Sequence, residues 1–151
     1  MKNSKNTPVR YNLLLLFFIL SPPNALADAF CHVMPVDPEW PAGLAGRYEI
    51  VGKNPQTGRA YTGTLNLSYG KNDYELTRSI GKKSIPGRAH IERCGLDQIT
   101  FLSVRYDSAP VTEALCSLAS DGDNYCRITC RTRIPGQSGF GLEAWFQQPD
   151  E

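Results

Sequence analysis

The sequence has little that signals catalysis. It contains two histidines, His32 and His90, and none of the G-x-S-x-G, H-E-x-x-H or paired-cysteine spacings that mark serine hydrolases, zinc proteases and zinc sites. Its carboxylates are scattered at turns. The sequence therefore favours a non-enzymatic protein with no cofactor and no metal site. A hydrolase would need a site assembled only in three dimensions, with His90 meeting a serine or a carboxylate.

The sequence also lacks an apolar run long enough to cross a membrane. The longest run, Leu13–Leu20, holds eight residues, whereas a membrane-spanning helix needs about 20. Three basic residues precede this run, and the small-residue sequence ALA follows it at 25–27. This order is typical of a secretory signal peptide. We therefore expect residues 1–27 to be a signal peptide and the mature protein to be periplasmic or secreted, with no transmembrane segment.

No charge of one sign predominates. The chain has 16 Lys and Arg against 15 Asp and Glu, and without the three basic residues of the predicted signal peptide the balance becomes 13 against 15. Because nucleic-acid binding needs clustered positive charge, a nucleic-acid partner is disfavoured. Two basic groups could still meet an acidic partner or an anionic glycan, or be solvated surface balanced by Glu49, Glu113 and Glu143. They are Lys82, Lys83, Arg88, His90 and Arg93, and Arg127, Arg131 and Arg133.

What the chain does have, after residue 45, is a series of short extended segments separated by Gly, Pro and Asn. The clearest is Ala60–Tyr69, in which apolar and polar residues alternate with the period of a half-buried strand. The same pattern predicts eight strands, at residues 46–52, 60–69, 73–80, 84–93, 97–106, 111–119, 124–134 and 139–147.

Short turns between successive strands favour an all-β fold, an eight-stranded antiparallel up-and-down barrel, because closure leaves no exposed strand edge. A two-sheet β-sandwich is the alternative. We expect residues 28–45 to form an extended N-terminal arm and residues 46–148 to form a single barrel domain.

Five cysteines follow the predicted signal peptide, and in an exported protein they are expected to form disulfides that staple the barrel. A three-residue loop at 120–122 would place Cys116 opposite Cys126. Cys130 would then bond Cys31 or Cys94. Because the count is odd, one thiol would be left over, and it could join two chains in a dimer.

The predicted inner face carries tyrosines and one cation. Alternation places Tyr48, Tyr61, Tyr74 and Arg78 inside as candidate ligand-binding residues, together with Tyr69 and Leu76. Arg78 could pair with an anionic ligand, or lie at the barrel mouth with its head group in water. Side chains can fill an eight-stranded barrel. Those expected to help fill this one are Cys126, Ile128, Cys130, Phe140, Leu142 and Phe146.

The sequence Gly46-Arg47-Tyr48 in the first strand, with Tyr61-x-Gly63 in the second, resembles the calycin group of small barrels, which are lipocalin-like and avidin-like. Calycins carry an aromatic residue in a G-x-W element on the first strand. Here it is tyrosine, and the last strand lacks the arginine that lipocalins usually pack against that aromatic. The resemblance implies a barrel that holds a small apolar ligand.

Two functions remain open. The first is an exported binding module that takes a small apolar or anionic ligand into the barrel mouth. The second is a protein-binding envelope factor, such as an inhibitor or an immunity-type protein, that uses loops of a solid barrel. It would hold its partner with the loops at 53–58 or 107–112, and Trp40 is a candidate contact.

Overall fold

The computed structural model describes residues 31–40, 43–120 and 126–149. Every regular element in this part of the chain is a β-strand, and no helix there has the length and hydropathy to span a membrane. The strands are β1 (His32–Val33), β2 (Gly46–Lys53), β3 (Ala60–Tyr69), β4 (Tyr74–Ile80), β5 (Lys83–Cys94), β6 (Ile99–Tyr106), β7 (Thr112–Ser120), β8 (Cys126–Arg133) and β9 (Phe140–Gln147).

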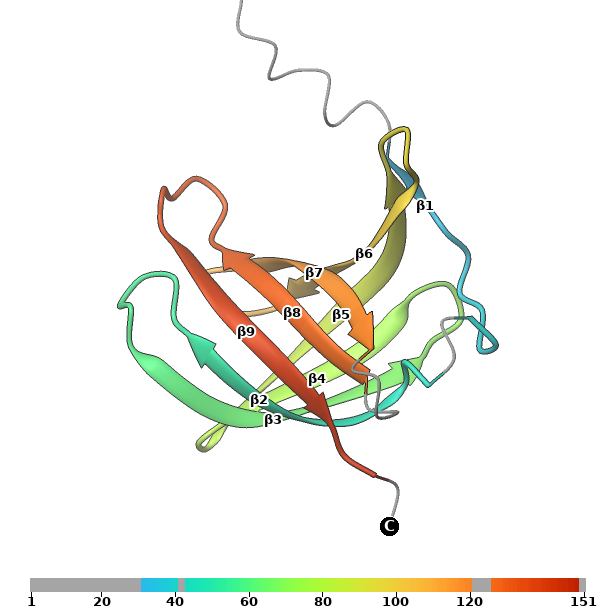
Figure 1. The fold of residues 1–151 in the computed structure, drawn as a ribbon. Coiled ribbons are helices and arrows are strands. Elements are labelled where there is room, and N and C mark those ends of the chain that lie inside the picture. Colours follow the sequence, from blue (N-terminus) through green and yellow to red (C-terminus); the bar gives the residue numbers. More distant parts are fainter. Residues whose placement is uncertain (1–30, 41–42, 121–125, 150–151) are drawn as a thin grey trace, which may run out of the picture.

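Strands β2 to β9 close into one barrel (Figure 1). Each strand pairs antiparallel with the next along the chain, and residues 142–147 of β9 pair back with residues 48–53 of β2. The prediction of an all-β, eight-stranded, antiparallel up-and-down barrel is therefore confirmed. The two-sheet sandwich is excluded, because the ladder of paired strands runs unbroken around the barrel.

Strand β5 is the longest and changes neighbours along its length. Its first part, 83–89, pairs with β4, and its last part, 87–94, pairs with β6. Where β4 has ended, the β5–β6 hairpin rises away from the barrel with β1 beside it (Figure 1). Strand β1 pairs with residues 92–93 of β5 and so covers backbone groups that would otherwise form an exposed edge.

The interior of the barrel is a packed hydrophobic core. Alternate residues of the eight strands point inward, as the period of two requires. The largest fully buried side chains include Trp145, Tyr48, Tyr74 and Tyr106. Tyr48 and Trp145 meet edge to face, with ring centroids 5.9 Å apart. Side chains thus fill the middle of the barrel, and little room for a ligand remains there.

The prediction for strand β9 has the wrong face inward. Phe140, Leu142 and Phe146 are 51%, 48% and 41% exposed, whereas Glu143 and Trp145 are buried. Hydropathy favours the wrong face here, because one alternation is wholly apolar (Phe140, Leu142, Ala144 and Phe146) and the other contains the charged Glu143. The face with Glu143 and Trp145 nevertheless points inward, where the carboxylate has a buried cationic partner, Arg78 on β4.

Two disulfides bridge the described residues. Cys31 bonds Cys94, and Cys116 bonds Cys130. The prediction that Cys116 lies opposite Cys126 is wrong, because Cys126 pairs with Ser120 and leaves five residues between the strands rather than three. The predicted bond of Cys130 to Cys31 or Cys94 is also wrong, since those two bond each other. The side chain of Cys126, the fifth cysteine, lies outside the described part.

The segment before β2 covers one end of the barrel, here called the closed end. Met34 and Val36 pack against the core, and Leu44 is itself buried in it. The Tyr48 hydroxyl donates a hydrogen bond to the Leu44 carbonyl at 2.5 Å. Tyr69 is 38% exposed at the same end rather than inside as predicted, and its hydroxyl donates to the carbonyl of Pro38.

Candidate functional site

The opposite end of the barrel, here called the mouth, contains a cavity of about 380 Å³. Its walls come from residues 54–61, from 80–85 across the β4–β5 turn, from 108–112 and from Ile134. Tyr61 and Arg78 contribute to the lining, and Arg59 and Lys83 are exposed residues of its wall. No carboxylate is among the described residues that line the cavity. The mouth is therefore a small, positively charged pocket with apolar walls.

Beneath the mouth lies a fully buried carboxylate, Glu143, which is 1% exposed. Its Oε1 atom accepts hydrogen bonds from Tyr61 and from Arg78, the latter at 2.5 Å. Its Oε2 atom accepts from Tyr106 and from the Trp145 indole nitrogen, both at 3.0 Å. Because a buried carboxylate is costly unless it is paired and hydrogen-bonded, these four donors and the one opposite charge explain how Glu143 is tolerated inside the barrel.

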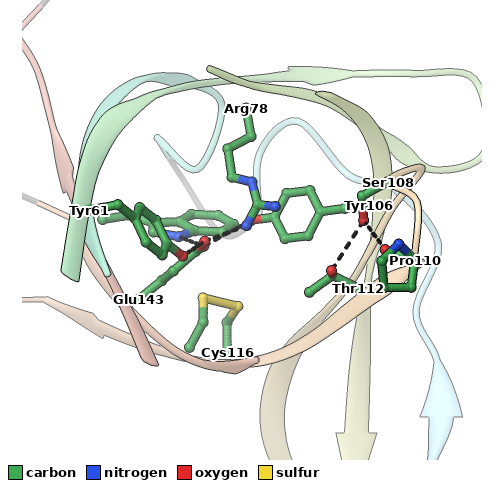
Figure 2. A network of polar contacts seen from close by, with 10 residues as sticks. Tyr61, Arg78, Tyr106, Ser108, Pro110, Thr112, Cys116 and Glu143 are labelled. Atoms are coloured by element: carbon green, nitrogen blue, oxygen red, sulfur yellow. Dashed lines mark hydrogen bonds and ion pairs between the residues drawn. A yellow bond between two sulfur atoms is a disulfide. The ribbon is translucent and has the colours of Figure 1, made fainter. Parts of the chain in front are cut away.

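Arg78 reaches the network from β4, across the barrel from Glu143 (Figure 2). Its guanidinium carbon lies 3.8 Å from the centroid of the Tyr106 ring, a favourable cation–π contact. One edge of the guanidinium bonds Glu143, while its Nε atom is buried and has no hydrogen-bond partner among the described residues. Arg78, which lines the mouth cavity, therefore keeps one buried donor without a partner in the described part of the chain.

Tyr61 can reach Glu143 because the residue opposite it on β2 is a glycine. Tyr61 and Gly52 are direct cross-strand partners. A Cβ atom added at Gly52 would overlap the Tyr61 ring. The missing side chain thus lets the ring lie over β2 and point its hydroxyl at Glu143, as an aromatic residue packed over a strand glycine does elsewhere.

The network shifts the pKa values of its members. Burial raises the pKa of Tyr61 and of Tyr106 above the ordinary value near 10, and the negative charge of Glu143 raises both further. For Arg78, burial is the largest single influence and would lower the pKa, but the charge of Glu143, with Tyr106, Tyr61 and the hydrogen bond to Glu143, together outweigh it, and the net direction is upward. Both tyrosines therefore stay neutral donors and Arg78 stays a cation over the ordinary pH range.

Hydrogen bonds also order the rim of the mouth at the β6–β7 connection. The Ser108 hydroxyl contacts the Pro110 carbonyl at 2.7 Å and the Thr112 hydroxyl at 3.1 Å (Figure 2). The Ala109–Pro110 peptide bond within this loop is cis. These contacts hold the loop against the start of β7, so one wall of the cavity is preformed.

The structure separates the four residues predicted to bind a ligand. Tyr61 and Arg78 come together at the mouth, whereas Tyr48 and Tyr74 are buried in the core and do not line the cavity. Tyr74 lies near the closed end, with its ring 5.7 Å from that of Tyr69. A ligand in the mouth would therefore meet Tyr61 and Arg78 but neither of the other two tyrosines.

Sequence reasoning missed Glu143, Tyr106 and Trp145. Tyr106 continues the inward alternation of Leu102 and Val104, so the period of β6 could have found it. The prediction that Glu143 is a surface counterion of the basic groups is wrong, because Glu143 is buried in the barrel. A lone charge in an apolar strand does not reveal its partner, because Arg78 precedes Glu143 by 65 residues.

His90 on the outer face of β5 meets the carboxylate of Glu92, with Nε2 and Oε1 2.6 Å apart. Ser103 lies opposite His90 on β6. Among the described residues, the His90 side chain hydrogen-bonds Glu92 and does not bond Ser103. His90 thus meets a carboxylate, one of the two contacts that the hydrolase alternative requires, but in the described part of the chain it bonds no serine that could act as a nucleophile.

Cys31, Glu92 and Cys94 also cluster within 4.8 Å of one another. However, both sulfurs belong to one disulfide, and a metal needs thiolates.

The fold and the site together define a closed, disulfide-bridged, eight-stranded β-barrel with a cationic mouth. No protein-family model matches the sequence, and no curated protein does. Among solved structures, a redesigned β-barrel is similar, with a TM-score of 0.49 and 16% sequence identity, over 71% of this chain and 92% of that chain.

Proposed function

We propose that the protein is an exported binding module that takes a small anionic ligand with an apolar body into the barrel mouth. The observation that carries this proposal is the composition of the cavity, in which the exposed Arg59 and Lys83 supply positive charge and no carboxylate is among the described lining residues. Arg78, which also lines the cavity, is already paired with Glu143. Ile80, Ile85 and Ile134 supply apolar wall. Pockets that bind small molecules combine apolar walls with a few directed polar groups in this way.

The ligand would lie above the Arg78–Glu143 network rather than within it. The core below is filled, so the cavity of about 380 Å³ sets the available space, at the lower end of the range for small-molecule pockets. A carboxylate or phosphate would accept hydrogen bonds from Arg59 and Lys83 at the rim. Its apolar part would contact the isoleucines.

Export is supported by the two disulfides, which are typical of an oxidising compartment. We propose that residues 1–27 are the signal peptide that directs the protein to the periplasm or out of the cell. We further propose that residues 28–45 are an arm and 46–148 the binding domain. The fifth cysteine, Cys126, could then join two copies in a dimer.

A second candidate, binding of an envelope protein through the loops at 53–58 and 107–112, is favoured by the filled interior. Most of the residues of these loops line the same mouth. Trp40 would not contribute, because it belongs to the segment at the other end, where Arg93 lies over its ring at 4.9 Å. The two candidates differ in what occupies the mouth.

Titration calorimetry with three probes of the same chain length tests the first proposal. We expect octanoate to bind, and octanol and octylammonium to bind at least about tenfold more weakly, since only octanoate carries the charge that the arginines and lysine attract. Lys83→Glu should weaken octanoate binding by a similar factor, because it places a negative charge in the wall of the cavity. Equal binding of all three probes, or none, would contradict the proposal.

A further inference from the structure

A second hollow lies on the outside of the barrel. Figure 1 shows the β5–β6 hairpin rising on one side and the β8–β9 connection on the other. The outer groove is the hollow of about 1050 Å³ lined by residues of β5 to β8, most of them with outward side chains, by residues 137–140, and by Cys31 and Asp73. None of its lining residues lines the mouth cavity. It is therefore a separate surface, larger than the space that a small molecule usually occupies.

Exposed apolar side chains lie in this groove. Leu115 on β7 and Phe140 at the start of β9 are 48% and 51% exposed, and Phe101 on β6 contributes a third apolar side chain. Between the first two, on β8, stands Arg131, whose guanidinium carbon lies 4.2 Å from the centroid of the Phe140 ring. Across the strands, Leu115 and Leu142 are the register partners of Arg131. The cation of Arg131 thus lies between two apolar side chains, Leu115 and Leu142, in one row across β7, β8 and β9.

The charges in this part of the groove do not balance. Arg105 and Arg133 share a single carboxylate, Glu113, at 3.3 and 3.1 Å. Arg131 forms an ion pair with no carboxylate among the described residues and has only the ring of Phe140 as a partner. The three arginines therefore exceed their acid by two charges. Toward β5 there is no such excess of positive charge, since Arg88 pairs with Asp73 and the carboxylate of Glu92 is in contact with His90.

We propose that the outer groove binds an extended acidic segment of another protein. A carboxylate of that segment pairs with Arg131, and neighbouring apolar side chains pack against Leu115 and Phe140. Charge complementarity identifies the partner: an acidic chain supplies the counter-charge that the arginines lack, and only a chain with apolar side chains covers the exposed leucine and phenylalanine.

Other occupants fit less well. A second copy of this protein, docked through the same groove, would bring arginine against arginine, and like charges across an interface are unfavourable. An anionic polysaccharide would satisfy the arginines but leave the apolar side chains uncovered. A flat membrane surface would not reach into a concave groove.

Selection of random 12-residue peptides displayed on phage, against the purified oxidised protein, tests the proposal. We expect the enriched peptides to be rich in Asp and Glu and to carry a leucine or an aromatic residue. Affinity for one such synthetic peptide should fall about tenfold or more in Arg131→Glu and in Phe140→Ser, because each change removes a central contact. Arg47→Glu is the matched control: Arg47 is exposed on β2 outside the groove, and its replacement should leave the affinity within about twofold.

All variants would first be compared by thermal unfolding, and only those that fold like the parent are scored. Lack of enrichment, enriched peptides without an acidic excess, or unchanged affinity in Arg131→Glu overturns the proposal. Binding of heparin or of phosphatidylglycerol vesicles that needs Arg131, in the absence of any peptide binding, also overturns it in favour of a polysaccharide or a membrane. If sedimentation shows a dimer that Arg131→Glu dissociates, the proposal is overturned in favour of a second copy of this protein as the occupant.

Discussion

At the scale of single residues, Glu143 organises the site. Its carboxylate joins one cation, two phenols and one indole from four different strands. A buried ion pair of this kind contributes little net stability compared with apolar residues, but removing one partner leaves an uncompensated charge. The network therefore fixes the positions of Tyr61 and Arg78 below the mouth, while its net contribution to the free energy of unfolding is small.

The consequence can be measured by replacing the cation. Arg78→Met should lower the free energy of unfolding by about 3–5 kcal/mol, because Glu143 is left buried and unpaired. Adding Glu143→Gln should restore part of this loss, since a neutral amide oxygen can still accept from the tyrosines and the indole. Urea unfolding gives both values. Arg105→Met, which breaks the exposed pair with Glu113, is the control and should cost less than about 1 kcal/mol.

A double variant no more stable than Arg78→Met alone would show that the charge of Glu143 is not what destabilises the single variant.

The raised pKa values of Tyr61 and Tyr106 predict a loss of stability in alkali. Each folded-state pKa lies above the unfolded value of about 10, so the folded state retains protons that the unfolded chain has released. Stability is therefore full below about pH 10 and falls as the pH rises further, by about 1.4 kcal/mol per pH unit for each tyrosine.

Urea unfolding between pH 8 and pH 11.5 checks this slope. Tyr106→Phe should make the decline shallower, whereas Tyr69→Phe, at an exposed position, should not. A decline of the same steepness in both variants would contradict the assignment.

At the scale of elements, alternation of apolar and polar residues predicted all eight barrel strands, with ends displaced by at most two residues from the observed ones. It succeeded because each of these strands has one face in the core. It failed in β9, whose more apolar face is the exposed one, and where the register depends on the length of a connection, as between β7 and β8. The burial of Glu143 could not be predicted, because it depends on a pairing between distant strands.

The β7–β8 register makes a prediction about the cysteines. Replacing both Cys116 and Cys130 by alanine should lower the free energy of unfolding by about 3 kcal/mol, the value for a loop of this length. Cys126→Ser should keep both bridges, because Cys126 takes part in neither. Peptide mapping under non-reducing conditions gives the connectivity. A bridge from Cys116 to Cys126 in the parent protein would contradict the observed register.

At the scale of the whole molecule, the two ends of the barrel differ. One end is covered by residues 31–40 and 43–45, and Cys31 bonds to the end of β5. The other end opens into a small cationic cavity. Between them the interior is filled. A molecule built in this way can hold a ligand only at its mouth or on its outer surface, so both proposals place binding outside the core.

Native mass spectrometry of the protein, purified without denaturation from the cells that make it, tests the binding role most directly. We predict one small anionic adduct per chain, which is released when Arg59 and Lys83 are both replaced by glutamate and retained in the matched surface variant Arg47→Glu. A chain that carries no adduct, or an adduct that persists in the Arg59→Glu/Lys83→Glu variant, would contradict the assignment of the mouth as the binding site.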